Sequence, residues 1–373
     1  MTSHPPIARI LSTGLFTPPN SISNDELVES YNGFVDQWNA AHPDDEPKTH
    51  SSAAFIEKAS GIKSRFVMDK AGILDTQRMR PKLPVRGDDE ISIMAEMALN
   101  AAREAMTNAD LGPDDIDAVI CAASNMQRQY PAMAVEVQSA LGIGGFAFDM
   151  NVACASAAFG IRTAIGLIQT GARRVLMVNP EICTAHLNFK DRDGHFIFGD
   201  VATAMIIGGP DDDGAGSFDI LDAQLITQFS NNIRNNMGFL DPATDSVINL
   251  DDAGTDKLFK QRGRSVFKEV VPMVSEFIAN HVDQLGIQSD QIRRLWLHQA
   301  NLSMNQLIAK RVLGHDPDTD EAPVVLDEYA NTSSAGSIIA FHKHRSDLQP
   351  GDIGVISGFG AGYSAGSIVV RAN

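Results

Sequence analysis

Hydrophobic positions recur at helical spacing through residues 92–108 and are followed by an unbroken apolar run, AVICAA, at residues 118–123. Gly112 and Pro113 stand between the two segments. The pattern predicts an amphipathic helix, a turn and a buried strand over residues 92–125. Residues 265–301 repeat this order, with Gly286 in the turn.

A second repetition follows each of these units. Cys154 lies 29 residues after Asn125, at the head of the helical run CASAAFGIRTAIGLIQTG, and Asn331 lies 30 residues after Asn301, at the head of NTSSAGSIIAFHKH. Repetition of a strand–helix unit at this scale predicts a duplicated α/β architecture with two sheets covered by helices.

We therefore expect an N-terminal half at residues 1–210 and a C-terminal half at residues 211–373. Two unrelated α/β domains would share helix–strand order for generic reasons, and they are the alternative. In the duplicated frame, Cys154 and Asn331 occupy equivalent places. His298 follows the strand pattern RRLWL, where the first half carries Cys121. A pseudo-twofold relation can therefore direct Cys154, His298 and Asn331 toward one point.

Composition restricts the class of protein. With 30 basic and 47 acidic residues, the formal net charge of −17 disfavours nucleic acid as a partner. No stretch is long and apolar enough for a membrane span, and no signal peptide opens the chain, so we expect no membrane association. Three cysteines without a CxxC pair give neither a disulfide framework nor a zinc site, and they favour a reducing, cytoplasmic setting.

Cys154 has the surroundings expected of a nucleophile. It is flanked by Ala153, Ala155 and Ser156, which leave it accessible, and the expected helix N-terminus would lower the pKa of its thiol. The backbone N–H of Cys154 would face a thioester oxygen. Cys121, in an apolar run, and Cys183 are expected to be packing residues.

Two reactions fit a cysteine, a histidine and an asparagine at one helix head. The first is hydrolysis, with histidine as the base for cysteine; the second is carbon–carbon bond formation on a cysteine-bound acyl group. Asn331 favours the second, because an amide cannot activate water but can donate a hydrogen bond to an enolate oxygen beside a neutral His298. The glycine-rich stretch 358–366 precedes a strand, not a helix, so we expect it to present backbone N–H groups to an oxyanion instead of binding a dinucleotide.

These motifs resemble 3-oxoacyl-(acyl carrier protein) synthase III of the thiolase superfamily. The similarity includes the ACAS context of Cys154, HQAN at 298–301, NTSSAGS at 331–337 and the terminal GFGAGYSAGSIVVR. It implies an α/β fold of the thiolase-like, duplicated, five-layered αβαβα type, a homodimer, and a catalytic Cys154–His298–Asn331 triad. The implied reaction moves an acyl group from acyl-CoA to the cysteine and condenses it with malonyl-(acyl carrier protein), releasing carbon dioxide, with no metal or redox cofactor.

The resemblance also assigns further residues. The backbone N–H groups of Cys154 and Ala361 would bind the thioester oxygen, with alanine where glycine is usual. The expected substrate-binding side chains are Phe359, facing the malonyl carboxylate, Phe267, Tyr130, Phe55 and Arg192. The expected docking residues for the acidic carrier protein are Lys268, Lys310 and Arg311.

Several positions depart from the family pattern. Phe55 stands where an adenine-stacking tryptophan is usual, Ala59 replaces an arginine, and Ser303 stands where an arginine is common. Polar, turn-rich insertions occupy residues 31–52 and 68–90, either as passive surface loops or as extensions of the substrate entrance.

The longer chain is most similar to the β-ketodecanoyl synthase subgroup, which is primed by octanoyl-CoA, and Tyr130 matches a residue that reaches the partner subunit's acyl pocket. An acetyl-CoA-primed synthase and a condensing enzyme of secondary metabolism remain alternatives. A thioesterase and a non-catalytic carrier-protein binder are more distant ones.

Overall fold

We describe a computed structural model of the chain, in which residues 4–212, 214, 216–243 and 257–373 are placed well enough to be described. The strands are β1 (Ala8–Phe16), β2 (Asn20–Ser23), β3 (Ser64–Val67), β4 (Ala118–Ala122), β5 (Phe146–Met150), β6 (Arg174–Ile182), β7 (Asp200–Gly208), β8 (Phe218–Ser230), β9 (Ile233–Arg234), β10 (Lys260–Gln261), β11 (Ile292–Leu297), β12 (Ile353–Gly360) and β13 (Gly362–Ala372).

The α-helices are α1 (Asn24–Ala41), α2 (Ala53–Ser60), α3 (Lys70–Leu74), α4 (Ile93–Asn108), α5 (Met133–Leu141), α6 (Ser156–Gln169), α7 (Gly263–Gln284), α8 (Leu302–Leu313), α9 (Leu326–Tyr329) and α10 (Gly336–Lys343). Short 3₁₀ turns include η1 (Pro113–Asp115), η2 (Ala153–Ala155), η3 (Cys183–His186) and η7 (Ser333–Ala335).

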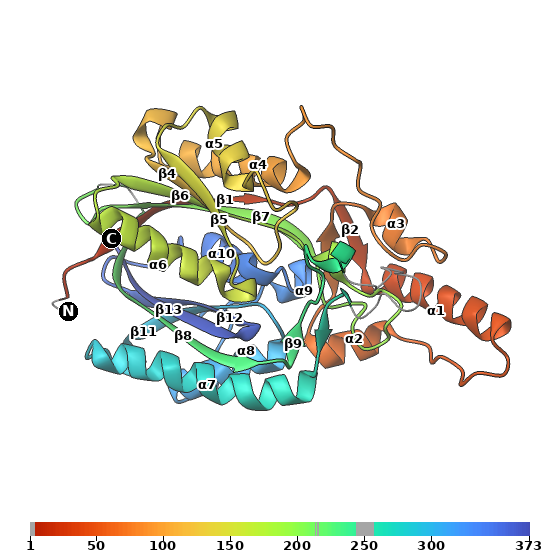
Figure 1. Cartoon of the computed structure of the whole chain (residues 1–373). Coiled ribbons are helices and arrows are strands. Elements are labelled where there is room, and N and C mark those ends of the chain that lie inside the picture. The colour runs from red at the N-terminus through yellow and green to blue at the C-terminus, as the bar shows by residue number, and fades with distance from the viewer. Residues whose placement is uncertain (1–3, 213, 215, 244–256) are drawn as a thin grey trace.

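The elements stack in five layers, as the resemblance implied (Figure 1). Helices α4 and α5 cover the outer face of one group of strands, and α7 and α8 cover the outer face of the other. Between the two groups lie α6 and α10, whose Ile161, Ile165, Ile338 and Phe341 are fully buried in one apolar cluster with residues of both groups of strands. This central layer is apolar because it has no solvent-facing side.

The two expected sheets are joined by hydrogen bonds along one edge. The strands form one nine-stranded order, β11-β12-β13-β8-β1-β7-β6-β4-β5. The join is short: β1 pairs with β7 over most of its length, but with β8 only at Ala8–Ile10. The prediction of two separate sheets therefore missed this shared edge, while the paired layers themselves are present.

The duplicated units occur where the sequence pattern predicts them. Helix α4 leads through η1 to β4, and α7 leads through a turn at Gly286 to β11. The segments headed by Cys154 and Asn331 both begin with a 3₁₀ turn and continue as α6 and α10. The boundary expected at residue 210 falls between β7 and β8.

The first insertion is not the turn-rich loop that its composition predicted. Helix α1 continues through residue 41, because Tyr31, Phe34 and Val35 lie on one face and are buried with α1's Leu27. Residues 42–52 lie outside the helix as a strap. The strap returns along α1, where Asn39 bonds to Lys48 and Asn32 bonds to Ser51. The second insertion contains α3, and its Met79 is 3% exposed.

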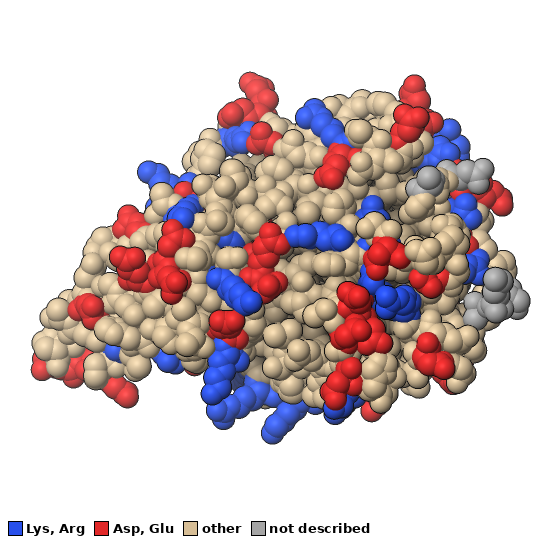
Figure 2. Space-filling view, turned by 180° about the vertical axis from the view of Figure 1, so that it is seen from behind, with Lys and Arg blue, Asp and Glu red and all other residues tan. Residues whose placement is uncertain are grey.

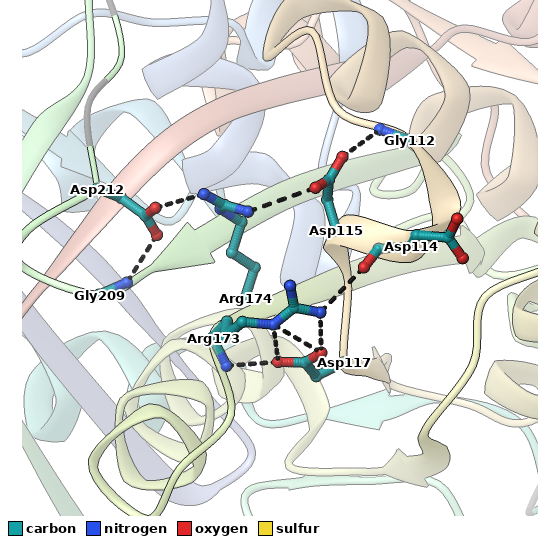
Figure 3. A network of polar contacts seen from close by, with 8 residues as sticks. All are labelled: Gly112, Asp114, Asp115, Asp117, Arg173, Arg174, Gly209 and Asp212. Atoms are coloured by element: carbon teal, nitrogen blue, oxygen red, sulfur yellow. Dashed lines mark hydrogen bonds and ion pairs between the residues drawn. The ribbon is translucent and has the colours of Figure 1, made fainter.

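An ion-pair network joins three chain segments near the start of β6 (Figure 3). Arg173 binds the carboxylate of Asp117 at 2.7 Å, and Arg174 pairs with Asp212 and lies 3.8 Å from Asp115. These contacts connect the turn before β4, the start of β6 and the turn after β7. Nine residues of β6 place the network about 25 Å from the strand's other end.

No helix among the described residues combines the length and apolar character needed to cross a membrane.

Candidate active site

Cys154 sits in a tight turn between β5 and α6. The hydroxyl of Ser156 accepts a hydrogen bond from the Val152 N–H at 2.8 Å, which closes the turn, and Ala153 has a positive φ of 47°. Gly360, at the end of β12, passes so close that a Cβ built on it would lie 2.6 Å from the Cys154 Cβ. The β12 backbone therefore approaches the cysteine closely, which only a glycine at position 360 permits.

Two cavities meet at Cys154. The larger, of about 760 Å³, is lined by Cys154, His298 and Asn331 together. The smaller, of about 250 Å³, is lined by Cys154 and Ala361, and its other lining residues include Ser124, His186 and Arg234. Cys154 thus lines both cavities, the larger of which we call the entrance cavity and the smaller the second cavity.

His298 follows β11, at the strand end where the sequence placed it. Its N–H donates to the Ser357 carbonyl at 2.8 Å, and its ring meets Phe359 edge to face, with centroids 5.3 Å apart. Burial lowers the pKa of His298 to about 4, against a smaller opposing effect of a hydrogen bond to the Ser333 backbone. The imidazole is therefore neutral at pH 7.

Asn331 is held from both its backbone and its side chain. Its N–H donates to the Ile197 carbonyl at 3.0 Å, and its carbonyl accepts from Gly199 at 3.1 Å. The side-chain oxygen accepts the Ser333 N–H at 2.8 Å. With its oxygen engaged, Asn331 has its amide hydrogens available as donors in the entrance cavity.

The prediction that the helix N-terminus lowers the pKa of the Cys154 thiol is wrong. Burial raises the pKa of its thiol to about 11, and the charge of Glu181 raises it further. Hydrogen bonds from the Ser333 hydroxyl, at 3.3 Å, and from the backbone of Cys154 and Ala361 act in the opposite direction but are outweighed. The sequence argument counted the helix N-terminus and omitted desolvation, which is the larger effect.

Several other expected substrate residues line the entrance cavity. Phe55, Phe267 and Phe359 contribute apolar wall, and Lys268 lies at the same cavity, as do Ala59 and Ser303. Arg192 stacks on the Phe55 ring with 4.2 Å between its guanidinium carbon and the ring centroid, and its Nε donates to the His50 carbonyl at 2.9 Å. These two expected substrate-binding side chains therefore cover each other.

Other expected residues lie outside the described cavities. Tyr130 is 85% exposed, and Lys310 forms an ion pair with Asp316 on the exposed side of α8, beside Arg311. Cys121 and Cys183 are fully buried, as packing residues should be. Among the described residues, no group of three or more His, Cys, Asp or Glu side chains is arranged to hold a metal ion.

Sequence reasoning missed two residues of the site. Ser333 donates to the Cys154 sulfur, and Glu181, at the end of β6, is 1% exposed close to that sulfur. The only signal for Glu181 was a glutamate within the apolar strand run RVLMVNPEI.

Two family models match the chain: 3-oxoacyl-[acyl-carrier-protein (ACP)] synthase III at residues 148–228, and the C-terminal model of the same name at residues 282–372. A protein from Pseudomonas aeruginosa named beta-ketodecanoyl-[acyl-carrier-protein] synthase is 59% identical over 92% of this chain and 99% of its own length. The chain belongs to the 3-oxoacyl-(acyl carrier protein) synthase III family.

Further similarities support this membership. Beta-ketoacyl-[acyl-carrier-protein] synthase III of Agrobacterium fabrum is 30% identical over 87% of this chain and 96% of its own. The crystal structure of 3-oxoacyl-[acyl-carrier-protein] synthase III from Aquifex aeolicus superimposes with a TM-score of 0.75 at 24% identity, covering 98% of this chain and 99% of that one. This structural likeness shows that the synthase III chain has the thiolase-like fold expected from its sequence.

Proposed function

We propose that the chain is a condensing acyltransferase of fatty acid synthesis. It transfers an acyl group from acyl-CoA to Cys154 and joins that group to the carbanion formed from malonyl-(acyl carrier protein). The observation that supports this proposal is that Cys154, His298 and Asn331, from separate elements, line one cavity.

The first step is transacylation. The Cys154 sulfur attacks the thioester carbonyl, and the new S–C bond replaces the bond to coenzyme A, which leaves with the thiol proton. The backbone N–H groups of Cys154 and Ala361 both hydrogen-bond at the sulfur, and donors in this place stabilise the developing oxyanion. The hydroxyl of Ser333 donates to the same sulfur, which favours the thiolate that must form.

The second step is decarboxylation and condensation. Neutral His298 and the Asn331 amide donate hydrogen bonds to the malonyl thioester oxygen, which becomes an enolate oxygen as carbon dioxide leaves. Phe359, fully buried against His298, gives the carboxylate an apolar wall that favours loss of its charge. The enolate carbon attacks the acyl–Cys154 carbonyl, and the released thiolate takes up a proton. Because these steps exchange only protons, electron pairs and carbon dioxide, we propose no metal or redox cofactor.

The primer is proposed to be a medium-chain acyl group, with octanoyl-CoA as the first candidate. An octanoyl primer extended by two carbons gives a β-ketodecanoyl thioester, the product in the name of the P. aeruginosa relative. We propose that the chain enters the second cavity, of about 250 Å³, which Cys154 also lines.

The acidic carrier protein is proposed to dock near the entrance cavity. Lys268 lines that cavity from α7, while Lys310 and Arg311 lie on α8. On the face seen in Figure 2, Lys and Arg side chains gather along the lower edge, the side on which α7 and α8 form the outer layer. Opposite charges at this edge would steer the partner and orient it.

A homodimer is proposed from the resemblance and from the sheet edge. Among the described strands, β5 pairs only with β4, and its Phe146 is 46% exposed. An unpaired edge strand with an exposed aromatic residue favours association through that edge. The cytoplasmic location expected from the sequence stays a prediction.

The decisive test of the reaction measures carbon dioxide release, acyl-CoA consumption and β-ketoacyl thioester together, with and without malonyl-(acyl carrier protein). We expect one carbon dioxide and one β-ketoacyl thioester for each acyl-CoA consumed, and only with the malonyl donor. In Asn331→Ala, acyl transfer to Cys154 should persist while carbon dioxide release falls by about 100-fold or more. Sustained hydrolysis of acyl-CoA without the malonyl donor would contradict condensation and indicate a thioesterase.

A further inference from the structure

Glu181 is a buried carboxylate that the two reaction steps leave unused. It lies at the end of β6 and is 1% exposed. Its described hydrogen-bonding partners include no Lys, Arg or His. A carboxyl group buried without a cation is costly unless hydrogen-bond donors surround it. Its contacts therefore indicate what it does.

The donors come from both halves of the chain. From the first half, Ser124 gives its N–H at 2.9 Å and its hydroxyl. From the second half, Ser334 gives its N–H at 3.2 Å and its hydroxyl. The Cys183 thiol adds a weak contact at 3.8 Å. One side chain thus joins the segment after β4 to η7, which are more than 200 residues apart in sequence.

The second-half contact bears on the residues that stabilise the enolate. Ser334 directly follows Ser333, whose hydroxyl donates to the Cys154 sulfur at 3.3 Å. The Ser333 N–H donates to the side-chain oxygen of Asn331 at 2.8 Å and so sets the direction of its amide. Ser333 has a positive φ of 50°, which is an unfavourable conformation for this residue type. Such a turn persists only when its surroundings hold it in place.

The first-half contact bears on the cysteine. The carbonyl of Ser124 accepts from the Asn151 amide at 2.8 Å, and the oxygen of the same amide accepts the Ala153 N–H at 2.9 Å, one residue before Cys154. A short chain of hydrogen bonds therefore runs from Glu181 to the nucleophile's turn.

We propose that Glu181 is a positioning residue that holds the Asn331–Ser334 turn in register with the turn of Cys154, and that its loss impairs condensation more than acyl transfer. The acyl-transfer step takes from this turn only the Ser333 hydroxyl, which can rotate toward the sulfur, and otherwise uses groups within η2 and at Ala361. Condensation needs the Asn331 amide itself at the correct angle. The inference rests on the proposed two-step function.

The two oxygens of Glu181 have different neighbours, which decides how it can be replaced. Oε1 accepts the backbone N–H groups of Ser124 and Ser334, which can only donate, so any replacement must keep an acceptor there. In the described part of the chain, Oε2 meets only the Ser124 hydroxyl and the Cys183 thiol, and a hydroxyl can rotate to accept a hydrogen bond instead. Burial raises the pKa of Glu181 to about 7, so this side can carry a proton near neutral pH. In Glu181→Gln, the amide oxygen can accept the two backbone N–H groups and the amide NH2 can donate to the Ser124 hydroxyl. Glutamine should therefore replace Glu181 with little loss.

The test compares Glu181→Ala, Glu181→Gln and Ser334→Ala with a matched control, Glu136→Ala. Glu136 also accepts the N–H and hydroxyl of a serine, Ser92, at 2.9 and 2.6 Å, but it lines none of the described cavities. Acylation is followed by the mass of the intact protein, and condensation by single turnover of the octanoylated enzyme with malonyl-(acyl carrier protein).

In Glu181→Ala we expect condensation to slow by roughly 10- to 100-fold, because a displaced catalytic group loses this much rate. Acylation should slow by less than about threefold relative to wild type. Glu181→Gln should restore condensation to within about threefold, and Ser334→Ala should slow it by about threefold. The ratio of the two rates should be unchanged in Glu136→Ala. Equal losses in both steps, or no rescue by glutamine, would overturn the proposal.

Hydrogen exchange gives a second readout, which requires neither the proposed reaction nor a folded Glu181→Ala variant. Hydrogen exchange of the Ser333 and Ser334 amides is measured in wild type, Glu181→Gln and Ser334→Ala, and in Glu181→Ala if it folds. Exchange should be faster in Ser334→Ala and Glu181→Ala, and close to wild type in Glu181→Gln. Unchanged protection in Ser334→Ala would contradict the proposal even if the wild-type enzyme proved to catalyse another reaction.

Discussion

At the scale of single residues, the site depends on how closely the chain approaches Cys154. Gly360 and Gly358 lie two apart on β12 and face the cysteine turn. A Cβ at Gly360 would lie 2.6 Å from the Cys154 Cβ and 3.1 Å from its sulfur, whereas one at Gly358 would make contacts no shorter than 3.4 Å. The two glycines therefore form a matched pair.

We predict that Gly360→Ala slows acylation of Cys154 by about 100-fold or more, because the nucleophile must move to make room. Gly358→Ala should stay within about threefold of wild type. Intact-protein mass measured against time of exposure to acyl-CoA gives both rates. Similar rates for the two variants would show that close packing at Gly360 does not set the position of the sulfur.

His298 should make stability depend on pH. Its pKa is about 4 in the folded protein and about 6.5 in an unfolded chain, so between these values the unfolded chain binds a proton that the folded one does not. This contribution to the free energy of unfolding is therefore complete above pH 6.5 and is lost as the pH falls toward 4, to the extent of about 3 kcal/mol.

In His298→Gln this loss is absent, so the variant's stability relative to wild type should improve between pH 7 and pH 5 in denaturant titrations. His315→Gln is a control of opposite sign, because the hydrogen bond to Glu321 raises the pKa of His315. Removing this histidine should lower the free energy of unfolding more at pH 5 than at pH 7. A stability difference for His298→Gln that is independent of pH would contradict a buried neutral imidazole.

The residues that the sequence could predict are those fixed by local pattern. Cys154 and Asn331 head equivalent helical runs, and His298 follows a strand, so periodicity alone placed them at element ends. Glu181 and Ser333 could not be found in this way. Their roles depend on contacts with segments far away in sequence, and the raised pKa of Cys154 depends on burial, which no local pattern reports.

At the scale of elements, the first insertion bears on the substrate entrance through its strap. Asn39 of α1 holds Lys48 by two bonds, accepting its N–H at 2.8 Å and donating to its carbonyl at 3.1 Å. The strap then offers the His50 carbonyl to Arg192, which covers Phe55 at the entrance cavity. Composition predicted a loop here because the segment is polar and contains Pro43, Pro47 and three Asp residues, but the buried face of α1 extended the helix.

We predict that Asn39→Ala loosens the strap. The Lys48 amide should exchange about fivefold faster, because a hydrogen bond of this kind contributes on the order of 1 kcal/mol to local stability. Asn100→Ala is the control, since Asn100 donates only within its own helix. Unchanged exchange at Lys48 would show that packing of residues 42–52, and not this pair of bonds, holds the strap.

At the scale of the whole molecule, the two ends of β6 serve different purposes. The first end is fastened by the Arg173 and Arg174 ion pairs of Figure 3, and the other carries Glu181 beside the cysteine. Duplication brings the Cys154 turn and the Asn331 turn together at one cavity, where the Ser333 hydroxyl donates to the Cys154 sulfur at 3.3 Å. Because each half supplies only part of the site, neither half alone presents the complete arrangement.

The central claim is that Cys154 carries the acyl group, and it is tested most directly by the mass of the intact protein. The protein is mixed separately with acetyl-, butyryl-, octanoyl- and dodecanoyl-CoA, with Cys154→Ala as the control. We predict a dominant octanoyl adduct that is absent from the variant. A dominant acetyl adduct would contradict the medium-chain primer, and an adduct that persists in Cys154→Ala would contradict the nucleophile.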